Sequence, residues 1–258
     1  MWNYPQCLGS LDGKHVRIKA PARSGTVCHI FKGYFSTLLF ALVDAKHSFR
    51  FVDVGAQGAS NDSGVYQRSK LNKMRQEGLL NLPDVTIGEE PDIQFHWIGD
   101  TAFAMSDRLF TPFSQEAIAN NEVKATYNYR HSRARRIVES TFGILCHRFK
   151  IMFGSIEQDY ESCIKTIQCC VTLHNYLNYK EGINKEEHQA GEEAANDHDD
   201  EEAANNERAL AAVGPLQNPD EHAQRQRLAD WFMTEAGKIK EFDQATRALR
   251  TSRREVTN

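Results

Sequence analysis

The chain has 258 residues, of which 40% are hydrophobic and 26% are charged, a composition typical of a globular protein with one sizeable core. It contains no apolar run of about 18 residues, the length of a transmembrane helix, and its first residues lack the features of a secretory signal, so we expect no membrane partner. The six cysteines show neither a Cys-x-x-Cys pair nor a zinc-site spacing, which favours a reduced intracellular protein over a disulfide scaffold.

The net charge of −4 is unevenly distributed along the chain. Residues 185–208 contain ten acidic and two basic residues, so this stretch carries −8 and the rest of the chain carries +4. Alanine, asparagine and glycine fill most of the stretch, which leaves too little apolar area to offset the conformational entropy lost on folding. We therefore predict a disordered acidic linker over residues 181–220. A plain solvated connection is its simplest role, and mimicry of nucleic acid or binding of a partner are the alternatives.

Strand patterns dominate the first 58 residues. Apolar runs and apolar–polar alternation predict four strand segments there, and glycines and the sequence Asp44-Ala45-Lys46 supply the turns between them. The four segments are residues 8–12, 15–19, 38–43 and 49–54. A polar loop follows over residues 79–95 and leads into one more short strand, residues 95–98.

Helical spacing of apolar residues predicts four helices. They cover residues 65–76, 130–149, 163–177 and 221–237. The sequence Asn61-Asp62-Ser63 supplies an N-cap for the first helix. Cys169, Cys170 and His174 in the third helix are interpreted as packing residues rather than as ligands. Strands that precede helices, with one short strand between them, predict an α/β or α+β single domain with a mixed sheet.

Three carboxylates hold informative positions. Asp12 follows one predicted strand, Asp100 follows another, and Glu139 lies in a predicted helix that is rich in arginine. Neighbouring buried strands end at the same edge of a sheet, so we expect the two aspartates to converge there and the glutamate to face them. Such an oxygen-rich site suits Mg²⁺ or Mn²⁺. An aspartate after a strand is more often a turn or N-cap residue, and the spacing alone does not decide between the two.

Two divalent ions about 3.5–4 Å apart can clamp a phosphodiester. One ion lowers the pKa of the attacking water or 3′-hydroxyl, and the other stabilises the leaving oxygen. Carboxylates are needed for this chemistry because His and Cys would favour softer metals. Converging carboxylates at the edge of the sheet would therefore indicate an enzyme that acts on phosphodiesters.

Five blocks of sequence occur in a recognisable order between about residues 7 and 177. They are Cys7–Pro21, which contains Leu11-Asp12-Gly13-Lys14-His15; Asp53–Gly58 with Asn61-Asp62-Ser63; Ile98–Phe103 with Leu109–Pro112; Tyr127–Leu145; and Leu173-His174-Asn175. Together they resemble the conserved blocks of the PIF/Harbinger transposases and the Harbinger transposase-derived nucleases. Because several blocks are long and their order is that of the family, the resemblance is specific.

The resemblance implies an α/β, RNase H-like fold, with a mixed sheet flanked by helices, over residues 1–180. By position it implies a catalytic triad of Asp12, Asp100 and Glu139 that binds Mg²⁺ or Mn²⁺, two ions in all. Asp62 falls in a block where an accessory metal ligand is expected, although its position equally suits the helix N-cap. All the matching acidic positions are intact. Residues 221–258 then form a C-terminal helix and a basic tail.

A basic cluster surrounds Glu139. Residues 123–150 contain seven basic residues, and Glu139 is their one acidic residue. Arg133 and Arg136 lie near Glu139 on the predicted helix, where they would contact the phosphates of DNA. An intrahelical ion pair with Glu139, three residues away, is the alternative for Arg136.

These features favour a divalent-metal-dependent DNA endonuclease or transposase-derived nuclease. A domesticated, non-catalytic DNA-associated adaptor is the main alternative, and a degenerate transposon fragment is a third. The family normally carries a helical DNA-binding region before its first block, so either the chain is truncated or a separate Myb-like DNA-binding partner supplies the targeting. The resemblance also implies residence in the nucleus, with the cytoplasm as a second location, and it is compatible with a homodimer.

Overall fold

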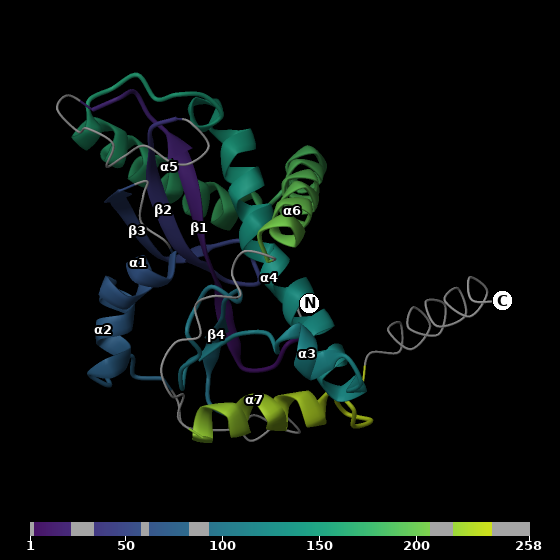
Figure 1. The fold of residues 1–258 in the computed structure, drawn as a ribbon. Coiled ribbons are helices and arrows are strands. Elements are labelled where there is room, and N and C mark those ends of the chain that lie inside the picture. Colours follow the sequence, from purple (N-terminus) through teal and green to yellow (C-terminus); the bar gives the residue numbers. More distant parts are fainter. Residues whose placement is uncertain (1–2, 22–33, 58–61, 83–92, 207–218, 239–258) are drawn as a thin grey trace.

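A five-stranded mixed sheet forms the centre of the molecule (Figure 1). The computed structural model describes residues 3–21, 34–57, 62–82, 93–206 and 219–238. The strands are β1 (Cys7–Arg17), β2 (Ser36–Val43), β3 (Phe49–Gln57), β4 (His96–Ile98) and β5 (Leu109–Phe110). Their order across the sheet is β3-β2-β1-β4-β5. β2 pairs antiparallel with β1 and β3, whereas β4 runs parallel to β1 and β5.

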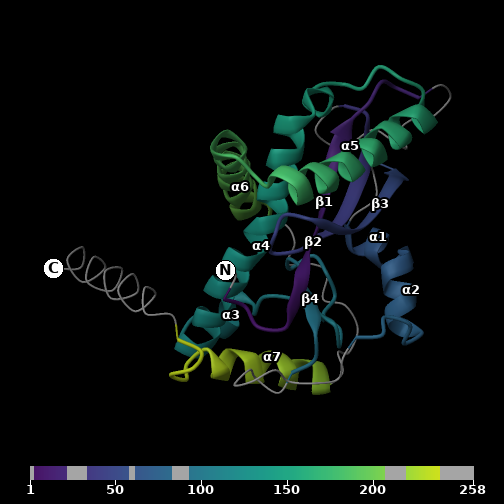
Figure 2. The same cartoon turned by 180° about the vertical axis from the view of Figure 1, so that it is seen from behind.

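Helices cover both faces of this sheet. They are α1 (Asp62–Arg68), α2 (Lys70–Gln76), α4 (Glu122–Arg148) and α5 (Tyr160–Glu181). Alternate residues of β2 point to opposite faces: Leu39 and Ala41 pack with α4 and α5, while Leu38 and Phe40 pack with α1 and α2. Figures 1 and 2 show α5 crossing one face of the sheet. Every residue of β2 is buried, as expected for a strand with both faces covered.

The predicted α/β class, a mixed sheet flanked by helices, is confirmed, with differences in the length of single elements. The segments 8–12 and 15–19 form one continuous strand, β1. The helix predicted over 65–76 is interrupted at Ser69, whose side chain caps α2. α4 begins at Glu122 rather than at residue 130. Three short elements had no sequence signal: β5, α3 (Gln115–Ile118) and the 3-10 helix η1 (Lys150–Met152).

The C-terminal helix α7 (Pro219–Trp231) packs into the body of the molecule, as Figures 1 and 2 show. Leu228 and Phe232 are buried in one cluster with Tyr4, which precedes β1. Arg225 anchors the helix, because its guanidinium donates hydrogen bonds to the carbonyl oxygen of Thr111 at 3.1 Å and to that of the next residue at 3.0 Å. The predicted C-terminal helix is thus present and contributes to the core.

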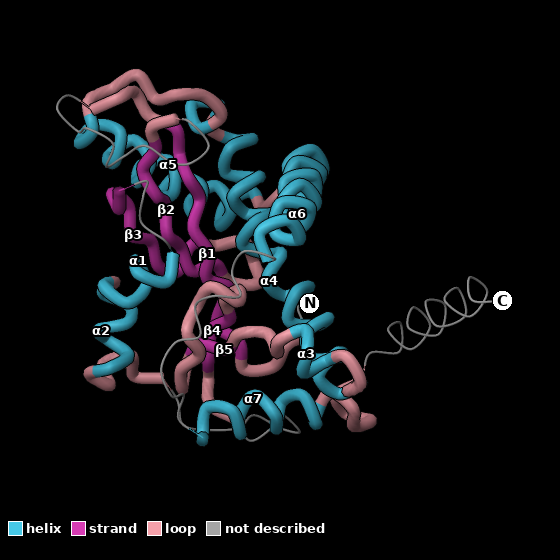
Figure 3. Tube along the Cα trace, viewed as in Figure 1, coloured by secondary structure: helices cyan, strands magenta, loops and turns pink. Residues whose placement is uncertain are grey.

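Helix α6 (Lys185–Asn206) occupies much of the segment that was predicted to be disordered, and it lies beside α4 (Figure 3). Asn184 and Glu187 form a capping box, in which the backbone N–H of each donates to the side chain of the other at 3.0 Å. Ala195 is almost completely buried. The prediction of disorder is therefore wrong for residues 185–196. It stays a prediction for residues 207–218, which lie outside the described residues.

The cysteines of the described residues agree in part with the packing role predicted for them. The five cysteines in the described part of the chain are free thiols. Cys170 and His174 are buried on α5, as predicted for packing residues, whereas Cys169 is exposed. Among the described residues, no helix combines the length and the apolar character needed to cross a bilayer.

Leu228→Ala is expected to lower the free energy of unfolding of the whole molecule by about 2–5 kcal/mol, because the side chain is fully buried and its loss leaves a cavity. Urea unfolding followed by circular dichroism should remain one transition, with a lower midpoint. Asp230→Ala, at an exposed position of the same helix, is the control and should stay within about 0.5 kcal/mol of the wild type. If Leu228→Ala left the urea midpoint of the main unfolding transition unchanged, this result would contradict the conclusion that α7 is part of the core.

Candidate active site

The register of the sheet brings Asp12 and Asp100 to the same level. Ser10 of β1 pairs in parallel with Ile98 of β4, and each aspartate lies two residues further along the chain from its paired residue. Asp12 lies within β1 and is only 4% exposed. Asp100 lies just beyond β4, where its Oδ1 accepts a hydrogen bond from the backbone N–H of Ala102 at 3.0 Å. Asp12 therefore lies inside a continuous strand rather than at a strand end, where it was predicted, and the register places it level with Asp100 beyond β4.

Asp62 is the third carboxylate of this group. It is the first residue of α1, and its carboxylate lies directly against Gly13, so that a Cβ at position 13 would be 2.3 Å from Asp62 Oδ1. A glycine is therefore required next to Asp12. Burial, followed by the negative charges of Asp12 and Asp100, raises the pKa of Asp62 to about 8. The three carboxylates thus interact strongly with one another in a buried environment.

The donor chemistry of these aspartates fits a divalent cation. Asp12 Oδ2 is buried, and no described residue donates a hydrogen bond to it. A buried charged oxygen without a partner is unfavourable, and the raised pKa of Asp62 is a second sign of the same crowding. Carboxylate oxygens are the ligands that Mg²⁺ and Mn²⁺ prefer. Within the part of the chain that the structure describes, no three His, Cys, Asp or Glu side chains have the arrangement of a metal site.

Glu139 is buried on α4 and forms an ion pair with Arg135, one helical turn earlier. Arg135 Nη2 lies 3.1 Å from Glu139 Oε1, and both side chains are buried. Arg136, the residue considered for this pair from the sequence, donates a hydrogen bond to the side-chain oxygen of Asn196 on α6. The buried guanidinium of Arg135 therefore supplies a positive charge next to the predicted catalytic glutamate.

The position of Glu139 along the sheet follows from a contact between Cys146 of α4 and Lys14 of β1. Burial raises the pKa of the Cys146 thiol, and Lys14, which lies next to this thiol, partly opposes the rise. Glu139 precedes Cys146 by two helical turns, so it lies on the same face of α4, about 10 Å further back. The N-terminal half of α4 packs against residues that precede β1 and the C-terminal half against the end of β1. A strand covers about 10 Å in three residues. Counting back by this distance from Lys14, the neighbour of Cys146, places Glu139 near the level of Asp12.

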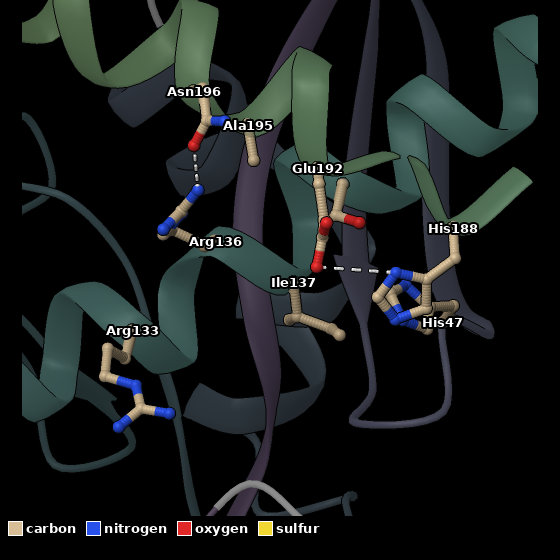
Figure 4. A pocket seen from close by; sticks show the side chains of 9 residues that line it. His47, Arg133, Arg136, Ile137, His188, Glu192, Ala195 and Asn196 are labelled. Atoms are coloured by element: carbon tan, nitrogen blue, oxygen red, sulfur yellow. Dashed lines mark hydrogen bonds and ion pairs between the residues drawn. The ribbon is translucent and has the colours of Figure 1, made fainter. Parts of the chain in front are cut away.

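Arg133 and Arg136 face α6 rather than the sheet. Both line a cavity of about 380 Å³ between α4 and α6, to which His47 and Glu192 also contribute (Figure 4). Figure 4 shows Arg136 directed towards Asn196. Arg133 is exposed. Its guanidinium carbon lies 5.8 Å from the centre of the Tyr129 ring, one helical turn earlier. The two arginines that were predicted to contact phosphate therefore lie on a surface shared with α6.

Two residues of the site were missed by the sequence analysis, although each carries a signal. Arg135 is four residues before Glu139, a spacing at which helical side chains meet. Gly13 directly follows Asp12, and its missing side chain makes room for the carboxylate of Asp62. Neither signal is strong by itself, because an arginine or a glycine at such a spacing is common.

Asp62→Asn is expected to raise the melting temperature of the metal-free protein at pH 7 by a few degrees. The pKa of Asp62 lies above its ordinary value of 3.8, so the wild type loses stability as the pH rises from about 4 towards 8, and the amide avoids this loss. Each kcal/mol of relieved repulsion corresponds to about 2–4 °C. Calorimetric melting with EDTA between pH 4 and 8 tests this, with Asp53→Asn on β3 as the control. A lower melting temperature for Asp62→Asn at pH 7 would contradict the repulsion.

Comparisons with known proteins identify the family to which the chain belongs. Residues 11–175, more than half of the chain, match the family model described as the DDE superfamily endonuclease. The chain is 28% identical to "Putative nuclease HARBI1" of Mus musculus over 175 residues, which are 66% of this chain and 46% of that protein. It is 28% identical to "Protein ALP1-like" of Arabidopsis thaliana over 177 residues, 67% of this chain and 43% of that protein. No solved structure matches the chain.

The chain spans less than half the length of these curated relatives. The range that matches the family begins beside Asp12, ends within α5 and includes Asp62, Asp100 and Glu139. Helices α6 and α7 lie beyond it. The resemblance seen in the sequence blocks is thus confirmed, and the chain belongs to the DDE superfamily endonuclease family.

Proposed function

We propose that this protein is a divalent-metal-dependent nuclease that hydrolyses phosphodiester bonds of DNA. Its family membership and its relatives named as putative nucleases support a nuclease-derived function. One observation carries the metal-dependent part of the proposal: Asp62 is buried beside Asp12 and Asp100, and burial, followed by the negative charges of these two aspartates, raises its pKa to about 8. Such crowding is relieved when a cation joins the carboxylates.

In this proposal, Asp12, Asp100 and Glu139 form the catalytic triad that binds two Mg²⁺ or Mn²⁺ ions, and Asp62 is an accessory ligand. The ions, when bound, activate the attacking water and stabilise the leaving oxygen. Asp12 and Asp100 are supported by neighbouring strands, and Glu139 approaches from α4. The ion pair with Arg135 favours the ionised form of Glu139, which is the form that coordinates a metal.

The partners belong to the same proposal. DNA is the substrate, and Arg133 and Arg136 contact its phosphates from the surface of α4. A separate Myb-like DNA-binding protein directs the chain to its target, and the chain acts in the nucleus, as a homodimer if the catalytic sites are paired on two DNA ends. DNA as the substrate is supported by the family, and the contacts of Arg133 and Arg136 by the basic charge of α4. The Myb-like partner, the nucleus and the homodimer are supported by the resemblance of the sequence blocks to the Harbinger proteins.

A second candidate function is that of a non-catalytic, DNA-associated adaptor that works through a DNA-binding partner. The observation in its favour is that the described residues contain no preformed metal-binding arrangement. In addition, Glu139 is already paired with Arg135. An adaptor would retain the fold and the buried charges without binding a metal.

Asp12→Asn and Asp100→Asn are expected to abolish Mg²⁺-dependent nicking of a supercoiled plasmid, because each removes a carboxylate from the crowded site. Calorimetric titration of Mg²⁺ and Mn²⁺ into the same samples should show loss of metal binding. Glu139→Gln should also abolish nicking, but it lowers stability as well, because it removes a buried charge from Arg135.

Asp53→Asn is the matched control, since it removes a carboxylate from β3, on the far side of β2 from Asp12. Its nicking rate and metal binding should equal those of the wild type. Metal-dependent nicking at the wild-type rate by Asp12→Asn would overturn the proposed mechanism. A folded wild-type protein that binds neither Mg²⁺ nor Mn²⁺ would favour the adaptor.

A further inference from the structure

Helix α6 approaches α4 through its smallest residues. A Cβ at Gly191 would lie 2.4 Å from Ser140 Oγ and 2.9 Å from the backbone oxygen of Ser140. A Cβ at Gly143 of α4 would lie 2.6 Å from the Cβ of Ala194. Together with the buried Ala195, these residues form one face of α6, because they recur at intervals of three and four. The two helix backbones are therefore in close contact.

Polar groups hold the two ends of this contact. Near the start of α6, Glu187 accepts hydrogen bonds from Arg148 Nε at 2.7 Å and from Arg148 Nη2 at 3.0 Å. The same guanidinium donates to the carbonyl oxygen of Gly182 at 2.7 Å. Further along, Arg136 donates to Asn196. Two arginines of α4 are thus occupied by residues of α6.

The contact buries few large apolar side chains. Among the residues of α6 whose burial the structure describes, Ala195 is buried, and on α4 the fully buried Ile144 lies against Gly191. A buried alanine contributes far less to stability than a buried leucine or phenylalanine. The association of α6 with α4 therefore depends on close backbone packing, on Ile144 and on the hydrogen bonds of Arg136 and Arg148.

The charges of the two helices are complementary. The sequence of α6 contains nine acidic residues and one lysine, whereas Arg133, Arg136 and Arg148 of α4 face α6. This is the arrangement that a polyanion would also find attractive, because a row of arginines on a helix surface binds phosphates without reading bases. On α6, Glu187 is bonded to Arg148, and Glu192 lines the same cavity as Arg133 and Arg136.

We propose that the outer face of α4, formed by Arg133, Arg136 and Arg148, is a binding surface for the phosphate backbone of DNA, and that α6 is its displaceable intramolecular cover. The proposal rests on the proposed function in so far as DNA is the ligand. It adds a competition: DNA and α6 exclude one another from the same arginines. The metal site on the other side of α4 is not part of this competition.

Gly191→Leu in the full chain is expected to release α6, because the new side chain would collide with the backbone of Ser140. Binding of a short fluorescent DNA duplex, followed by anisotropy, should become about tenfold tighter at low salt. The slope of log K against log salt should become more negative by about 1, because Arg136 loses its partner Asn196. Arg133 is already exposed, and Arg148 is also held by His174 and Gly182. Gln189→Leu adds the same side chain at an exposed position of α6 and should leave both quantities unchanged.

Hydrogen exchange of the α6 amides shows whether Gly191→Leu has released the helix. Release of α6 with unchanged DNA affinity and salt dependence would overturn the proposal. Absence of duplex binding in every variant, with metal binding at the aspartates intact, would overturn it and leave the metal site standing. DNA binding that follows the state of α6, in a protein that binds no Mg²⁺ or Mn²⁺, would support it and remove the nuclease function.

Discussion

The packing of α4 against β1 determines where the other parts of the molecule lie. α4 is 27 residues long and contacts β1, β2 and all of the helices from α3 to α7. Val138, Phe142 and Leu145 of α4 cover one face of the sheet. They belong to the same cluster as Leu39 and Ala41, which β2 directs to that face. A helix of this length spans about 40 Å. A single rigid element therefore relates the sheet, the carboxylates and the two C-terminal helices to one another.

This packing buries charges that must be neutralised, and the chain does so in two ways. Arg135 neutralises Glu139 through an ion pair within α4. At the start of α1, the raised pKa of Asp62 means that a proton neutralises this aspartate near neutral pH. Buried polarity of this kind reduces stability and is retained where a site binds a charged ligand.

Much of the sheet could be predicted from the sequence because strand alternation is a local pattern. The meeting of Asp12 and Asp100 was predictable too, since it follows from two strands that run in parallel. Which arginine pairs with Glu139 was not, because Arg135 and Arg136 both have suitable spacing and only the packing of α4 distinguishes them. Helix α6 was missed for another reason. We predicted disorder because residues 185–208 have little apolar area to bury. Helices α4 and α6 nevertheless meet, because Gly191 has no side chain to keep them apart.

The contact between Tyr4 and Phe232 has a consequence for how the molecule is made. Their rings meet edge to face with centroids 5.5 Å apart, although they are 228 positions apart in the chain. Closing so long a loop is slow, and during translation it cannot occur before residue 232 has left the ribosome. Until then the nascent chain presents an aromatic surface, formed by Tyr4 and the first turns of α4, that its own C-terminal helix will later bury. The chain is thus exposed to aggregation between the synthesis of α4 and that of residue 232, and protection by a chaperone has its greatest effect in that interval.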